Sequence, residues 1–547
     1  KRLPSTACET PSGDECPRPR VPTLADQHPG WPRNAEAERR DDAAPVVLGA
    51  ERRASPSPSS SRLSHLTLPA QTDSPPVSAP RFPTDELCPR ALLNVMMTDY
   101  LDLIYPLIPV VHRPTFRADL AAIRDFADPD FLALLFGLAA LVVGLLPSRF
   151  LVYRAMAPEF AMRFETRTAM INCCSDMCMR LRAVGYWDHI SLRKWAVTYV
   201  LFGALFQTGQ MNASRMFEVE SIQLGRLLGL HRISEYDGLN CIETQLRKKA
   251  FWLLFYTYAH AILQCGRAEH LIFLDRSLIH QVDFSALEPL EVDDEQILDN
   301  SIVTPASPSS LVVGFIFHSR VFLRGLRETI ANEGCDCELN RSPTLRLSRL
   351  RDLLAEMRYM LDDVPVHMRQ WATADEESLP RPTDDIPGLE LRDCGKGTDA
   401  KILHGQLETM RVNLHATHLW LQSLLLDQVD VLLQENTARS DPGIDTGAAA
   451  LKANWAERED ICRQMLHLLH GIPHAYQEPN GMYLTYKVRD VAVALLNCPF
   501  EPHERPARRA MEYIRDFTKA LSRLDQSEII NTSSLRSWVD MDRQGAS

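Results

Sequence analysis

A few residues of this 547-residue chain have side chains that could do chemistry, but their spacing completes no familiar reactive site. The sequence has no His-Glu-x-x-His, Gly-x-Ser-x-Gly or Gly-x-Gly-x-x-Gly pattern, so common metalloprotease, hydrolase and dinucleotide-binding signatures are missing. The nearest phosphate-loop candidate is Gly395 to Thr398 with Gly388 upstream. Its spacing is wrong and no strand precedes it, so we interpret it as part of a loop.

The cysteines are the next candidates, as metal ligands. Cys173, Cys174 and Cys178 place two thiols at i, i+4 on one helix face, but no second Cys or His pair at zinc-finger spacing completes a tetrahedral set. Cys335 and Cys337 form an isolated pair. We interpret the cysteines as reduced structural thiols, and we predict neither a metal site nor a cofactor in this chain.

Three histidines provide the enzymatic alternative. His231, His260 and His270 could converge only in three dimensions, and nothing in their local spacing supplies the carboxylate or metal that a catalytic imidazole needs. The sequence therefore favours a protein that is not an enzyme, with an all-helical enzyme as the rival.

A basic stretch, Arg247-Lys248-Lys249, precedes the aromatic run Phe251 to Tyr258 and invites comparison with a nucleic-acid patch. Glu243 stands four residues before Arg247, which is the spacing of a helical ion pair, so we interpret the stretch as the solvated first turn of a buried helix. The formal net charge of -12 also argues against the whole chain being a nucleic-acid clamp.

Composition divides the chain near residue 86. Residues 1–86 contain fifteen of the 36 prolines and no sustained apolar period, which predicts a disordered tail or linker. Residues 87–543 are predicted to form one all-α unit. Proline-rich loops are expected at 300–310 and, with acidic character, at 375–399. Helical periodicity predicts helices over 92–104, 129–146, 152–168, 189–207, 212–229, 242–264, 310–332, 343–362, 401–435, 448–473, 482–496 and 505–526.

The longest apolar run, Phe131 to Leu146, is shorter than the roughly 20 residues of a membrane span and is closed by Pro147. We interpret it as a buried core helix and expect no membrane partner.

Three stretches over residues 90–300 resemble the middle homology region of fungal Zn(II)2Cys6 zinc binuclear cluster transcription factors, also called the fungal-specific transcription factor domain. The first is YLDLIYPLIPVVHRPTF, with Tyr105, Pro106, Pro109, His112, Arg113, Pro114 and Phe116. The second closes on Leu228, Gly229, Leu230, His231 and Arg232. The third is similar to the family's Arg-x-x-x-Phe-Trp helix and its following turn, with Arg247, Phe251, Trp252, Gly266 and Arg267.

The resemblance implies a nuclear regulatory domain of an RNA polymerase II transcription factor, and Leu246 to Phe255 is similar to regulators of sugar utilisation. In the family, DNA is bound by a six-cysteine zinc cluster, which this chain lacks. We expect the cluster, with its zinc, upstream of Lys1; the alternative is a cluster-free corepressor that binds protein partners.

The resemblance also implies three kinds of partner: transcription machinery or coregulators, a small-molecule effector, and a second copy of the chain in a homodimer. We interpret Trp195, Trp252 and Tyr256 as part of a plain aromatic core, with an effector cavity among their helices as the alternative.

Overall fold

The described helices confirm the predicted all-α class. The computed structural model describes residues 83–265, 273–274, 276–303, 310–332, 342–370, 396–439 and 446–525. Within those ranges the only β pairing is an isolated bridge between Ile297 and Ile302. The predicted tail lies outside the described residues up to position 82. Pro83–Glu86 forms a 3-10 turn in which Thr84 is buried, so the folded part begins before the predicted boundary.

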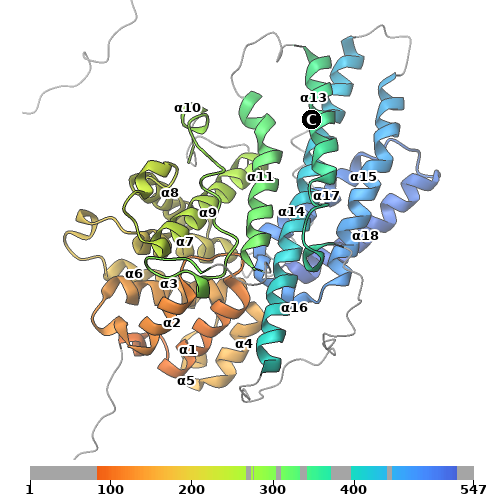
Figure 1. Cartoon of the computed structure of the whole chain (residues 1–547). Coiled ribbons are helices and arrows are strands. Elements are labelled where there is room, and N and C mark those ends of the chain that lie inside the picture. Colours follow the sequence, from red (N-terminus) through yellow and green to blue (C-terminus); the bar gives the residue numbers. More distant parts are fainter. Residues whose placement is uncertain are drawn as a thin grey trace, which may run out of the picture. The chain divides into compact units, whose positions relative to one another are not determined.

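The helices follow the chain in two groups, coloured by sequence in Figure 1. The first group is α1 (Arg90–Asp99), α2 (Arg113–Ala121), α3 (Pro129–Leu145), α4 (Pro147–Met156), α5 (Pro158–Arg163), α6 (Arg167–Arg180), α7 (Leu192–Gln207), α8 (Met211–Leu227), α9 (Cys241–Cys265) and α10 (Arg276–Ile279). The second group is α11 (Val312–Asn332), α13 (Pro343–Tyr359), α14 (Lys396–Arg439), α15 (Thr446–Gly471), α16 (His474–Gln477), α17 (Gly481–Val493) and α18 (Arg505–Leu524).

Local chemistry explains where the central helix begins. Asp128 precedes α3, and its Oδ1 accepts hydrogen bonds from the backbone N–H groups of Asp130 and Phe131, both at 3.1 Å. Pro129 occupies the first position, where a missing N–H costs nothing. Every residue of α3 from Phe131 to Leu145 is buried, which confirms the predicted core helix.

The predicted helix 152–168 is wrong as a single element. The chain forms α4 and α5 there, separated by Ala157, whose backbone is extended (φ −136°, ψ 101°) because Pro158 follows it. The next helix, α6, begins after Thr166, whose side chain accepts a hydrogen bond from the N–H of Ala169. Thr166 is a favourable N-cap residue, but the apolar residues of α6 show little helical periodicity, so the predicted set has no separate helix there.

The helices pack in pairs around one continuous hydrophobic core, and the described residues from Pro83 to Asp525 belong to one compact unit. The main partners of α3 are α6 and α7, and α7 also packs on α8. In the C-terminal half, α14 contacts α11, α13, α15 and α17. Its start corrects the predicted loop 375–399: residues 375–395 lie outside the described part, but Lys396 to Asp399 already belong to the helix.

Hydrogen bonds join the N-terminal and C-terminal helices at several points. Gln406 Nε2 donates to the carbonyl of Leu101 at 3.1 Å, and the N–H of Met482 donates to Gln207 Oε1 at 2.8 Å. Ser148 N–H donates to Glu478 Oε1, also at 2.8 Å. The two halves therefore share buried polar contacts as well as apolar ones.

No single described helix is long and apolar enough to cross a membrane, although α3 and α4, bent by 115° relative to each other, pass that test as a pair.

Candidate functional site

A buried charged network joins the first and third family-like stretches. Asp294 lies in a 3-10 turn (Asp294–Gln296) and accepts a hydrogen bond from Lys249 Nζ of α9 at 2.7 Å. The same carboxylate accepts hydrogen bonds from the hydroxyl of Tyr105 and from the backbone N–H of Arg113, the latter at 2.9 Å. His112 Nε2 lies 2.8 Å from the Asp294 carbonyl, which can only accept, so the ring nitrogen donates.

The network holds Asp294 ionised. Burial alone would raise the pKa of this carboxyl, but the charge of Lys249 and the hydrogen bonds from Lys249, Tyr105 and the Arg113 N–H outweigh burial and lower it to about 2. Burial raises the pKa of Tyr105 well above its ordinary value, so the phenol stays neutral and acts as a donor. Asp294 is thus an anion inside the protein, anchored by residues from distant parts of the chain.

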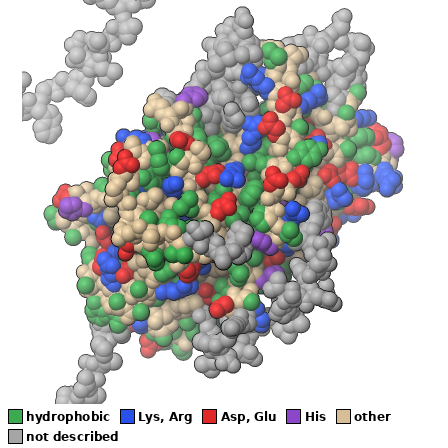
Figure 2. Space-filling model, in the orientation of Figure 1, with side chains coloured by type: hydrophobic (Ala, Val, Ile, Leu, Met, Phe, Trp, Pro, Cys, Tyr) green, Lys and Arg blue, Asp and Glu red, His purple; other side chains and the backbone are tan. Residues whose placement is uncertain are grey.

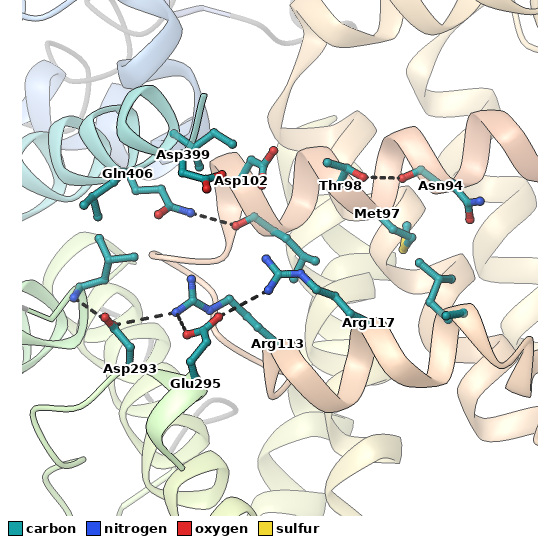
Figure 3. Close-up of a pocket in the computed structure, with 16 residues that line it drawn as sticks. Asn94, Met97, Thr98, Asp102, Arg113, Arg117, Asp293, Glu295, Asp399 and Gln406 are labelled. Carbon is teal, nitrogen blue, oxygen red and sulfur yellow. Dashed lines mark hydrogen bonds and ion pairs between the residues drawn. The ribbon is translucent and has the colours of Figure 1, made fainter. Parts of the chain in front are cut away.

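An open cavity of about 720 Å³ lies next to this network (Figure 3). Arg113 and Arg117 of α2 project into it, facing Asp293 and Glu295. The described residues that line it come from four segments: Asn94, Met97, Thr98, Leu101 and Asp102; Arg113, Arg117, Leu120 and Ala121; Asp293, Glu295 and Leu311; Asp399, Ile402, Leu403 and Gln406. Residues far apart in sequence therefore build its walls.

Charged side chains from several segments line the large cavity. Glu295 engages both arginines, with Oε2 at 2.6 Å from Arg113 Nη2 and Oε1 at 3.4 Å from Arg117 Nη1. The lining holds four carboxylates and two guanidinium groups, a formal excess of two negative charges. None of the described lining residues is His, Cys, Ser or Lys, so carboxylates are the only groups there that could act as a base. The arrangement suits binding of a ligand with cationic or hydrogen-bond-donating groups.

The first family-like stretch links the turn after α1 to α2 and lies beside this cavity. Tyr105, His112 and Arg113 are hydrogen-bonded to Asp294 in the network. Pro114 is the second residue of α2. Phe116 is buried, with its ring 6.4 Å from that of Tyr100 and 5.9 Å from that of Phe131. Pro106 and Pro109 lie between the π-helical turn Tyr100–Ile104 and α2.

The second stretch forms the end of α8. Gly229 has φ +66°, a conformation that suits glycine, and Leu230 is fully buried after it. Arg247 Nη1 donates to the Leu228 carbonyl at 3.2 Å, so the third stretch contacts the second. His231 packs edge-on against the Phe273 ring at 6.3 Å, and Arg232 pairs with Glu235 at 3.6 Å.

The third stretch is mostly core. Phe251 and Trp252 are completely buried, and Trp252 Nε1 donates to the Leu287 carbonyl at 2.9 Å. The predicted ion pair between Glu243 and Arg247 is confirmed at 2.8 Å. The prediction of a solvated first turn is wrong for Lys249, whose side chain is buried and paired with Asp294. The ionised partner offsets the cost of burying the charge, and it lies 45 positions further along the chain, where the local pattern could not show it. Gly266 and Arg267 lie outside the described residues.

The predicted aromatic core is confirmed for Trp195 and Trp252. Trp195 stacks on Tyr199 at 5.1 Å, and both Trp195 and Trp252 belong to the aromatic core. Tyr256 lines a second and much smaller cavity. The residues that build the large cavity were missed, because Asp293 to Glu295 lie in a generally acidic segment whose local pattern resembles a surface loop.

The remaining candidate residues are histidines and cysteines, and those in the described part are buried or half-buried. His260 Nδ1 bonds the Tyr256 carbonyl at 2.7 Å and the ring stacks on Trp420, whereas His270 lies outside the described residues. Cys174 and Cys178 are buried, and burial raises the pKa of Cys178 to about 12. Cys335 and Cys337 lie outside the described part. Within that part, no group of three His, Cys, Asp or Glu side chains could hold a metal ion.

Basic side chains on the face drawn in Figure 2 are mostly accompanied by acidic ones. No family model, no curated protein and no solved structure matches the chain.

Proposed function

We propose that this chain is the regulatory, middle homology domain of a fungal RNA polymerase II transcription factor, acting in the nucleus. The observation that carries the proposal is the joining of the three family-like stretches. Lys249 reaches the Asp294 carboxylate to which Tyr105 and Arg113 also bond, and Arg247 reaches the Leu228 carbonyl. Patterns that resemble one family in sequence thus cooperate in one structural unit.

In this proposal the helical unit is a receiver of signals, and DNA is bound by a zinc cluster outside the chain. In this proposal the large cavity binds a small-molecule effector with an amine or other cationic group, because carboxylates outnumber guanidinium groups along its walls. An effector seated there would contact α1, α2 and α14 together. It would favour whichever arrangement of those helices it binds more tightly, and so alter the exposure of surfaces that coregulators contact.

The experiment tethers the full chain, through a heterologous DNA-binding domain, to a reporter promoter of intermediate basal activity in a fungal host. We expect reporter transcription to change several-fold in one direction relative to the DNA-binding domain alone. Lys249→Met, which breaks the network, should abolish the change, and the exposed-site variant Lys519→Met should retain it. A fusion that is folded and nuclear but leaves the reporter at the control level would sink the proposal.

A cluster-free corepressor is the second candidate, and it rests on the net charge of -12 and the lack of a six-cysteine array in this chain. It predicts the same tethered activity but no cysteine array in the transcript upstream of Lys1. Sequencing that transcript separates the two candidates. Analytical ultracentrifugation of the full chain tests the expected homodimer.

A further inference from the structure

The smaller cavity lies among α3, α7, α9, α11, α14 and α17, and its lining shares no residue with that of the large acidic cavity. Its volume is about 90 Å³. Because one water in the liquid occupies about 30 Å³, the space suits a compact molecule of roughly three or four carbons and not a drug-sized ligand.

A buried lysine without a counter-charge lies at this cavity. Lys487 of α17 is 2% exposed, and its Nζ donates to Thr417 Oγ1 at 2.7 Å. The nitrogen also lies 5.5 Å from the ring centre of Phe322. None of the described residues lining the cavity is Asp or Glu. Burial lowers the pKa of Lys487 to about 7, with no carboxylate to oppose it.

Three hydrogen-bond acceptors in the same lining have no partner. Asn480 Nδ2 donates to the Thr409 carbonyl, which leaves Oδ1 unsatisfied. His260 bonds a carbonyl through Nδ1, so its proton is there and Nε2 is an unsatisfied acceptor. The Thr417 hydroxyl donates a hydrogen bond to the Asn413 carbonyl, so it can only accept from His318. His318 therefore donates from Nε2, and its Nδ1 is an unsatisfied acceptor. Buried acceptors without donors are costly and call for one.

We propose that this cavity binds a small hydroxy-monocarboxylate, with its carboxylate against the Lys487 ammonium and its hydroxyl donating to Asn480 Oδ1 or His260 Nε2. A carboxylate supplies the missing counter-charge, and a single negative charge matches a single lysine. A hydroxyl supplies a donor that a plain carboxylate lacks. A neutral polyol would satisfy the acceptors but leave the ammonium unpaired.

Binding should be linked to proton uptake. The titratable groups that line the cavity are Tyr199 of α7, Tyr256 and His260 of α9, His318 of α11, and Tyr483 and Lys487 of α17. Asp490, one turn along α17, accepts bonds from Trp420 Nε1 at 3.0 Å and from Arg489 Nη2 at 2.7 Å. A bound carboxylate stabilises the protonated lysine, so at pH 8 the complex should take up protons from the buffer.

The test uses the full chain in thermal unfolding and isothermal calorimetry with sodium lactate, sodium propionate, propane-1,2-diol and sodium chloride at matched ionic strength. We expect lactate to raise Tm saturably by a few degrees, propionate and the diol each to raise it less, and chloride not to raise it. Lys487→Met should abolish the lactate effect, and Lys519→Met, a matched change at an exposed lysine, should preserve it.

Calorimetry in buffers of different ionisation enthalpy adds a readout that a purely structural lysine would not move: proton uptake at pH 8 in the original chain and none in Lys487→Met. The inference is overturned if lactate acts no more than chloride, if it acts equally on Lys487→Met, or if propionate equals lactate. Because the site does not depend on the proposed function, these results are independent of the reporter assay.

Discussion

The Lys249 ammonium nitrogen lies 2.7 Å from Asp294 Oδ1, and the two side chains are only 3% and 1% exposed. The pair joins α9 to a turn that also holds Tyr105 and the start of α2. The contribution of this ion pair to stability depends on both partners, because removing one of them leaves an uncompensated charge inside the protein.

Lys249→Met and Asp294→Asn should each destabilise the fold strongly, by about 3–5 kcal/mol, and the double variant should cost less than the sum of the two. Denaturant unfolding of the four proteins of this double-mutant cycle measures the coupling. Lys519→Met removes an exposed ion pair with Asp516 and should change stability by less than about 0.5 kcal/mol. Additive effects of the two buried substitutions would contradict the coupling.

Gly229→Ala should cost about 1–2 kcal/mol, because the residue has φ +66° and a Cβ would lie 2.5 Å from Glu235 Cγ. Gly471→Ala is the matched control: Gly471 ends α15, and a Cβ there meets nothing within 4 Å. Thermal unfolding of both variants checks the difference. Equal Tm values would show that the turn after Leu228 tolerates a side chain.

Buried histidines should make the protein sensitive to acid. Burial lowers the pKa of His415 to about 3, and it also lowers the pKa values of His260, His318 and His418. The unfolded chain therefore binds more protons than the folded chain below about pH 6.5, so stability should fall as the pH falls from there.

His415→Gln tests this acid sensitivity, since glutamine keeps a donor for the Met368 carbonyl without titrating. The variant should lose roughly 2 kcal/mol less than the original chain between pH 6.5 and pH 5. The comparison is made by denaturant unfolding at both pH values, with the exposed-site variant His503→Gln as the control. An unchanged pH profile for His415→Gln would refute the assignment.

Lys487→Met should raise stability at neutral pH. The pKa of Lys487 is about 7 in the folded chain against an ordinary 10.5, so between these values the unfolded chain binds more protons and stability rises with pH. Below pH 7 the cost of burying the charge is fully present, on the order of a few kcal/mol. The advantage of the methionine variant in thermal unfolding should shrink from pH 7 to pH 10; a constant difference would count against the low pKa.

Local sequence determined much of the helical framework. Periodicity alone placed α3, α7, α8 and α9 within a few residues of their observed bounds, and the i, i+4 spacing of Glu243 and Arg247 predicted their ion pair. Such features depend on residues a turn apart, which a linear sequence displays directly. Breaks at single residues, such as Ala157 before Pro158, were harder to place because apolar spacing continues across them.

Only the tertiary structure decided which distant charges meet. Lys249 has the pattern of a solvated first turn until Asp294, 45 positions later, lies against it. Asp399 lines the large cavity because α14 packs on the turn after α1. Lys487 is buried because residues of α9, α11 and α14 pack against its side of α17. Periodicity shows which face of a helix is buried, but the identity of the neighbour on that face is set by packing among many helices, which no local pattern records.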